Sequence, residues 1–257
     1  MQTKAERLGR MLTVGADLMF GRERELLLAP LIGANVASAL DIGCGNGAYM
    51  ARLSDAFPGV KLTGVEIDEA MYRQASALNG ESRRWNIVRG GYESLTGTGP
   101  YDAIIVRLVA PHIPDRAEFA RWLAAHTHDR SLLFVIDFDD GRYRGWDGLP
   151  LFSSLYEDAR RQLKGRRGFL QLPDQLKLEF RQAGFEPIRT ESYAIRADRR
   201  ESREKCRDYM RFATEYLLDE PIDRLREREL ADWLERPDAE LEIPMFGIVF
   251  AKTEETG

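Results

Sequence analysis

Residues 38–47 read SALDIGCGNG, an apolar run that ends in an acidic residue and then in glycines at every second position. A helix-like stretch, 46–57, follows, and this order is typical of a β-strand that turns directly into a helix. Glycines at such a turn let a ligand approach the backbone closely. The spacing is neither the G-x-x-x-x-G-K-[ST] of a P-loop nor the G-x-G-x-x-G of a dinucleotide fingerprint.

Outward from this loop, short apolar runs alternate with helix-like stretches. The expected strands are 38–42, 61–65, 85–88, 103–106 and 132–136, and the connecting stretches 46–57, 69–78 and 116–125 carry apolar residues at helical spacing. This alternation predicts an α/β fold with a doubly wound parallel sheet. Right-handed crossovers then bring the loops after the strands to one edge, where such folds bind ligands.

The flanking segments predict helices and two closing strands. Residues 3–33 are expected to be helical, with a break at Gly21-Arg22. Further helices are expected at 152–163, from Pro173 to Gly184, at 206–217 and from Pro221 to about Glu235, with strands at 185–195 and 240–252. Pro244 and Gly247 predict a bulge or an irregular start in the last strand.

Composition excludes several classes of protein. The chain has 257 residues, 44% apolar and 31% charged, which is typical of a globular protein. The net charge of -5 argues against a nucleic-acid binder, and no apolar run is long enough to span a membrane. The first residues lack a secretory signal pattern, and Cys44 and Cys206 form no ligand motif. We therefore expect a cytoplasmic protein without a structural metal.

Two carboxylates end neighbouring strands. Asp41 precedes the first glycine, where it would repel a pyrophosphate but attract a cationic amine, so an aminoacyl ligand is favoured. Glu66 ends the second strand, 23 residues after Gly43, where doubly wound nucleotide sites bind ribose hydroxyls. Ile67 follows with an apolar side chain suited to one face of an adenine ring.

The segments LDIGCGNG, GVEID, RGGYESL and YDAIIVRLVAPHIPD, in this order and spacing, resemble the successive motifs of class I S-adenosylmethionine-dependent methyltransferases of the small-molecule branch. The resemblance runs motif by motif over about 38–139, and 185–195 with 240–252 is similar to the family's sixth and seventh strands. It implies a Rossmann-like sheet of seven strands, mostly parallel with the last antiparallel. S-adenosylmethionine is the implied cofactor, with S-adenosylhomocysteine as product.

The resemblance also implies site residues. Asp41, Gly43 and Gly45 would line the methionine part of the cofactor, Glu66 would hold the ribose, and the backbone near Arg107 would face the amino-acid end. The family often has an acidic residue after the first glycine of RGGYESL to bind the adenine amino group. This chain departs from that pattern with Gly91 followed by Tyr92, so the Tyr92 N–H or Glu93 would have to serve instead.

Two polar residues near the fourth strand have competing interpretations. His112 follows the fourth strand, at the edge of the sheet where an acceptor would lie, and is a candidate general base. In the alternative interpretation, it only orders the loop. Arg107 interrupts an apolar strand and requires a carboxylate, supplied by the cofactor, by an acidic substrate or by a structural Asp137 or Asp139. The basic clusters 160–167 and 196–207 are expected to be solvated helix faces.

These observations predict one methyltransferase domain over 1–257. It would comprise a helical cap (1–35), a cofactor-binding core (36–140) and a substrate side (141–257) whose helical insertion (198–237) acts as a lid. The expected reaction is methyl transfer to oxygen or nitrogen of a small-molecule acceptor, with no nucleic-acid or membrane partner and with a homodimer left open. The alternatives are other sulfonium chemistry, such as an intramolecular cyclisation, or an inactive relative that only binds the cofactor.

Overall fold

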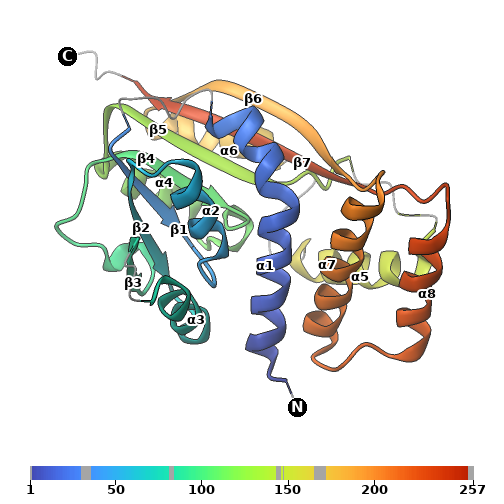
Figure 1. Cartoon of the computed structure of the whole chain (residues 1–257). Coiled ribbons are helices and arrows are strands. Elements are labelled where there is room, and N and C mark those ends of the chain that lie inside the picture. Colours follow the sequence, from blue (N-terminus) through green and yellow to red (C-terminus); the bar gives the residue numbers. More distant parts are fainter. Residues whose placement is uncertain are drawn as a thin grey trace.

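A seven-stranded sheet in the order β3-β2-β1-β4-β5-β7-β6 forms the middle layer of the computed structural model (Figure 1). The strands are β1 (Ser38–Ile42), β2 (Lys61–Glu66), β3 (Trp85–Arg89), β4 (Tyr101–Arg107), β5 (Thr127–Phe138), β6 (Phe185–Arg196) and β7 (Glu242–Lys252). The first five strands run parallel, and β7 is antiparallel to both its neighbours, β5 and β6. The structure describes residues 2–29, 36–80, 84–142, 146, 148–164 and 172–253. The expected doubly wound sheet with one antiparallel strand is confirmed.

Helices cover both faces of the sheet because alternate residues of its strands point to opposite sides. Leu40 and Ile42 join the cluster covered by α4 (Arg116–Ala125) and α6 (Leu172–Gln182). Ala39 joins the opposite cluster, which includes side chains of α1 (Lys4–Glu23), α2 (Ala48–Ala56), α5 (Pro150–Lys164), α7 (Arg200–Leu218) and α8 (Arg224–Glu235). The remaining long helix, α3 (Glu69–Asn79), packs against β2 and β3.

The N-terminal helix departs from the sequence prediction. It continues through Gly21 and then becomes a π-helix at Arg24–Leu28, so the expected break at Gly21-Arg22 is wrong. An exposed helical glycine costs only about 1 kcal/mol relative to alanine. That cost is offset because Met19, Glu23 and Leu27 are all buried along one side of this helix. Residues 30–33 of the expected helix lie outside the described residues.

The last strand is more regular than its sequence predicts. β7 is continuous, and the register shift falls instead in β6, between Pro187 and Arg189. Pro244 lies opposite Ala194 of β6 and precedes the first β7 residue paired with β5, so its missing N–H disturbs only one side of the strand. Gly247 serves close packing, since a Cβ there would lie 2.2 Å from Leu27 Cδ1.

Polar residues gather at the carboxyl edge of the parallel strands. Asp41 is the fourth residue of β1, Glu66 and Arg107 end β2 and β4, and Asp137 is the last residue but one of β5. The register pairs Ile42 with both Val65 and Val106, so these strand ends lie at one level. The fold therefore brings four charged side chains from separate strands to a common edge.

Candidate active site

A cavity of about 500 Å³ opens at this edge of the sheet. Its walls come from strand ends, from the glycine loop after β1, and from helices α1, α5 and α7. Figure 1 shows α1 running beside α7, so that these helices stand over the carboxyl edge. The volume is in the range of pockets that hold small molecules and cofactors.

The glycine loop holds its shape through backbone hydrogen bonds and left-handed residues. The N–H groups of Gly43 and Cys44 donate to Val65 O at 2.9 and 3.1 Å, which ties the loop to β2. Gly43 has φ +70° and Gly45 has φ +58°, a region that favours glycine. A Cβ at Gly43 would lie only 2.6 Å from Val109 Cγ2. Both conformation and space therefore explain the glycine that the motif requires here.

Glu66 joins this loop to the loop after β2. Its Oε2 accepts from Gly45 N–H and its Oε1 from Asp68 N–H, both at 2.8 Å. The side chain is buried, yet a carboxylate with one bond at each oxygen can accept more. Ile67, between the two loops, lines the cavity although 76% of it is exposed, which is unusual for a large apolar residue.

Asp41 is a buried carboxylate with an unsatisfied oxygen. No described residue hydrogen bonds to its Oδ2, and only 4% of the residue is exposed. Burial raises the pKa of Asp41 to about 7, reinforced by Glu66 and Glu23 and opposed by the Arg107 guanidinium. A cationic group in the cavity would supply the missing partner, which fits the predicted preference for an amine.

Helix α1 is attached to the glycine loop by Asn46. Its Nδ2 donates to Gly9 O at 2.8 Å and to Thr13 Oγ1 at 2.9 Å, while its Oδ1 accepts from Ala48 N–H. The sequence carried no signal for this contact, because it joins residues more than thirty positions apart. Asn46 therefore links the N-terminal helix to the cavity wall.

The carboxylate partner of Arg107 is Glu23 of α1. The Arg107 Nε lies 3.0 and 2.9 Å from the two Glu23 oxygens, and its Nη2 contacts Met19 Sδ at 3.2 Å. The guanidinium also lies 4.4 Å from the centre of the Tyr49 ring. Asp137 and Asp139 are therefore not its ion-pair partners, contrary to the structural alternative from the sequence.

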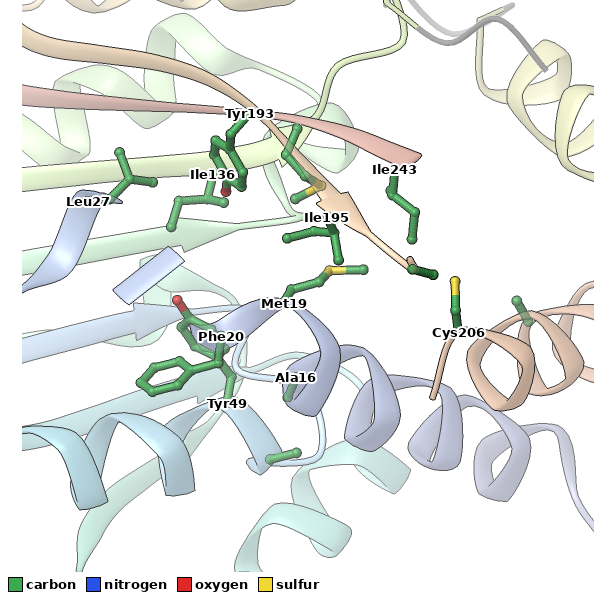
Figure 2. Packing of buried hydrophobic residues seen from close by; sticks show 14 of the residues in the cluster. Ala16, Met19, Phe20, Leu27, Tyr49, Ile136, Tyr193, Ile195, Cys206 and Ile243 are labelled. Atoms are coloured by element: carbon green, nitrogen blue, oxygen red, sulfur yellow. The ribbon is translucent and has the colours of Figure 1, made fainter. Parts of the chain in front are cut away.

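Apolar packing supports this ion pair. Phe20 of α1 and Tyr49 of α2 meet edge to face, with ring centroids 5.4 Å apart. Figure 2 shows Met19 of the same helix extending toward Ile195, with Tyr193 on the same strand. Met19 and Tyr49 also line the cavity. The end of α1 is thus part of the cavity wall.

The cavity wall contributed by β5 and the segment after it contains aromatic residues and a second unsatisfied carboxylate. Trp146 stacks on Phe152, with centroids 5.3 Å apart, and Tyr156 lies beside both rings. Asp137 is 2% exposed, its Oδ1 accepts from Phe138 N–H at 2.8 Å, and no described residue hydrogen bonds to its Oδ2. Burial raises the pKa of Asp137 to about 7, opposed by the Phe138 N–H and by nearby guanidinium groups.

Sequence reasoning missed the importance of Asp137, although one signal was available. Like Asp41, it ends an apolar strand at the carboxyl edge. Arg160 corrects a second expectation, because its side chain is only 13% exposed and lines the cavity instead of lying on a solvated face. Arg160 forms an ion pair with Asp140. Residues 165–167 of the same basic cluster lie outside the described residues.

The other predicted site residues lie in different places. His112 is exposed at the cavity rim, at the end of a 3-10 turn, with its N–H donating to Val109 O. Gly91 and Tyr92 are not among the residues that line the cavity. The Tyr92 ring instead packs on Phe119 and Trp122, at 4.8 and 5.2 Å between centroids. Glu93 does not line the cavity either, so a role of this segment in binding adenine stays a prediction.

The turn after β4 contains a residue that the sequence did not single out. Leu108 has φ +56°, which costs an L-residue with a side chain about 1–2 kcal/mol. Its N–H donates to Ile136 O at 2.8 Å, and the residue lines the cavity. Strained backbone of this kind is common at functional sites.

Within the described residues, no three His, Cys, Asp or Glu side chains gather in a way that could hold a metal ion. Among the described helices, none combines the length and apolar character that crossing a membrane requires.

Solved structures share this fold. The phosphoethanolamine N-methyltransferase 2 of Haemonchus contortus in complex with S-adenosyl-L-methionine superposes with a TM-score of 0.64 at 14% identity, over 98% of this chain and 58% of that one. At this identity the similarity shows the fold alone.

Curated relatives match part of the chain. The malonyl-[acyl-carrier protein] O-methyltransferase of Legionella pneumophila is 27% identical over 160 residues, 62% of this chain and 48% of the relative. The protein-L-isoaspartate O-methyltransferase of Ectopseudomonas mendocina is 33% identical over 111 residues, 42% of this chain and 50% of the relative. The chain spans about half the length of the curated relatives it matches.

A family model that covers more of the chain identifies the family. A family model described as a methyltransferase domain matches residues 18–190, more than half of the chain. That region includes the glycine loop, Glu66, Arg107 and Asp137. The chain therefore belongs to the methyltransferase domain family, which confirms its resemblance to the class I S-adenosylmethionine-dependent methyltransferases.

Proposed function

We propose that this protein transfers the methyl group of S-adenosylmethionine to oxygen or nitrogen of a small-molecule acceptor. The observation that carries the proposal is one cavity lined by two different groups of residues. The glycine loop, Asp41 and Glu66 lie at the ends of β1 and β2, whereas Asp137 and the aromatic residues belong to β5 and the segment after it, and β4 separates β1 from β5 in the sheet. A ligand bound by each group would be held in contact with the other, and positioning of this kind supplies much of the acceleration of a displacement reaction.

The cofactor end has a donor and acceptor set suited to the family's cofactor. The Asp41 carboxylate would bind the ammonium group, with the Gly43 and Gly45 backbone against the amino-acid chain. Glu66 would accept hydrogen bonds from ribose hydroxyls while keeping its two loop bonds, and Ile67 would cover one adenine face. When bound, the cofactor supplies a methyl group on a positively charged sulfur. The unsatisfied Asp41 oxygen and the close approach at Gly43 support this fit.

The remaining predicted residues would contribute less directly to binding and catalysis. The Gly91 and Tyr92 backbone, with Glu93, would bound the adenine. Arg107 would act through its backbone, since its guanidinium is engaged by Glu23. His112 at the rim is a candidate base for a proton released toward solvent.

We also propose a role for each segment of the chain. Residues 1–35 would cap the cofactor, 36–140 would bind it, and 141–257 would form the acceptor side, with 198–237 as a lid. Helices α1, α5 and α7 all contribute to the cavity wall, which supports this division. The net charge of -5 favours a small acceptor over a nucleic acid. The two free, buried cysteines favour a cytoplasmic location.

The test is a calorimetric titration of the purified protein with S-adenosylmethionine and with S-adenosylhomocysteine, followed by mass spectrometry after incubation without an acceptor. Micromolar binding of both compounds with intact cofactor is the expected result. Conversion of the cofactor to another product would favour sulfonium chemistry other than methyl transfer. Absence of binding would contradict the proposal and favour an inactive relative.

A further inference from the structure

Asp137 is a buried carboxyl group that the proposed cofactor contacts do not use. It lines the cavity from β5, which β4 separates from β1 and its glycine loop, and the same cavity is lined by the aromatic residues Trp146, Phe152 and Tyr156. Its Oδ1 is bound to the Phe138 N–H, while no described residue satisfies Oδ2. An unsatisfied buried carboxylate oxygen costs free energy, so a ligand that donates a hydrogen bond to it would be favoured.

The aromatic faces near Asp137 are already engaged by cations of the protein itself. The Arg160 guanidinium lies 5.8 Å from the Phe138 ring centre and 5.5 Å from that of Tyr156. Arg107 occupies the Tyr49 face in the same way. A cationic acceptor would meet these like charges instead of free ring faces, so the surroundings favour a neutral acceptor.

The shape of the wall favours a flat acceptor. Trp146 and Phe152 lie nearly parallel, with an interplanar angle of 24°. The Trp146 Nε1 donates to Glu242 O at 3.0 Å, which holds the indole in place. The two rings cover each other's facing sides, and a planar ligand extends a stack of this kind better than a bulky one.

We infer that the acceptor is a neutral, planar hydroxyl compound whose O–H donates to Asp137 Oδ2, and that Asp137 is the catalytic residue that takes its proton. The inference rests on the proposed methyl transfer. In the step, a bond forms between the acceptor oxygen and the methyl carbon as the bond from that carbon to sulfur breaks. The electron pair of the broken bond stays on sulfur, and the hydroxyl proton moves to Asp137.

The groups around Asp137 suit this role. Arg160 of α5 and Arg107 of β4 favour its ionised form, whereas burial disfavours it. Among the described residues, the Tyr193 hydroxyl of β6 also interacts electrostatically with Asp137, and burial keeps that phenol protonated by raising its pKa. Asp140, the ion-pair partner of Arg160, is a further charged group beside it. A base whose pKa lies near neutrality is well suited to general-base catalysis. Proton acceptance by Asp137 should therefore increase as the pH rises through about 7.

The experiment measures binding, so that it does not depend on turnover. The protein is saturated with S-adenosylhomocysteine and titrated with 2-naphthol or with 2-methoxynaphthalene, which has the same ring system but no donor. The variants are Asp137→Asn and, as a matched control, Asp129→Asn, which alters an exposed residue of the same strand. Titration calorimetry with S-adenosylhomocysteine alone and thermal melting are run on every variant.

We expect wild type and Asp129→Asn to bind 2-naphthol at least tenfold more tightly than Asp137→Asn, since a hydrogen bond to a charged group has roughly this effect. The affinity for 2-methoxynaphthalene should be unchanged by the substitution. The preference of the wild type for 2-naphthol should also be larger at pH 8 than at pH 6, which tests the inference even where Asp137→Asn folds poorly.

Three results would overturn the inference: equal losses for both probes, equal affinities of the wild type for both probes at pH 8, or no binding of 2-naphthol. If S-adenosylhomocysteine still binds in these cases, the proposed function stands and only the acceptor assignment fails. If it does not bind, the proposed function itself fails.

Discussion

The buried ion pair between Glu23 and Arg107 provides a strong test of how α1 is held on the sheet. The side chains are 0% and 9% exposed, and Arg107 Nε lies about equally far from both Glu23 oxygens. Glu23→Gln removes one charge with little change in size. Among the described residues, Arg107 would then keep the Tyr49 ring and Met19 Sδ as close contacts, with the carboxyl groups of Asp41 and Asp137 acting on it electrostatically.

The expected loss of stability follows from burial. Removing one member of a buried pair costs about 3–5 kcal/mol, because the other charge remains uncompensated. The glutamine amide oxygen can still accept one hydrogen bond, so we expect the lower end, about 3 kcal/mol. For a chain of this size that loss lowers the melting temperature by roughly 6–12 °C.

A neighbouring ion pair provides the control. Arg22 and Glu25 also pair near the end of α1, but their side chains are 46% and 66% exposed. Glu25→Gln should therefore change stability by no more than about 1 kcal/mol. Urea unfolding of both variants, with Glu23→Gln/Arg107→Met as the double variant, measures the difference. If Glu23→Gln proved no more destabilising than Glu25→Gln, or if the double variant recovered nothing, the buried pair would not be what anchors α1.

Three further predictions concern the cofactor end. Gly43→Ala should weaken S-adenosylhomocysteine binding by calorimetry and lower the melting temperature, because it combines φ +70° with a 2.6 Å contact; Gly21→Ala, with open space around it, should do neither. Glu66→Ala should reduce the same affinity by roughly 10–100-fold, while the exposed Glu69→Ala should not. Burial raises the pKa of Asp41 above its unfolded value, so folding retains a proton, and stability in urea should fall as pH rises from about 4 to about 7. Asp41→Asn should remove part of that fall, and an unchanged pH dependence would contradict the assignment.

The parts of the fold that follow from local patterns were predictable. Helix Arg116–Ala125 and strand Ser38–Ile42 have the bounds expected from the sequence, because capping residues and apolar spacing act over a few positions. Strand β5 begins at Thr127 instead of residue 132, since its start is set by pairing with β4 and not by its own apolar pattern. The predicted helix break at Gly21 was wrong for a similar reason, because burial of the following turn outweighed the low helix propensity of glycine.

The site residues show the same distinction: those in short motifs were predictable, and those held by contacts between distant residues were not. Asp41, Gly43 and Glu66 were assigned because each lies at a strand end within a short motif, and the sheet topology converts that position into proximity. Glu23 was not found, since its partner Arg107 is 84 residues away and no spacing encodes the contact. Arg160 looked like part of a solvated cluster because only the packing of α5 against the cavity separates it from its neighbours.

Three of the carboxylates that line the cavity, Asp41, Glu66 and Asp137, differ in whether their oxygens have hydrogen-bond donors in the free protein. Glu66 has a backbone donor at each oxygen, so it is satisfied without a ligand. Asp41 and Asp137 each keep one buried oxygen without a described donor, and burial raises both pKa values to about 7. Such groups cost stability in the free protein. The two oxygens come from β1 and β5, which β4 separates in the sheet, as expected for a site with two ligands. Asparagine at either position should therefore stabilise the free protein while weakening a different ligand in each case, which is the usual opposition between stability and function.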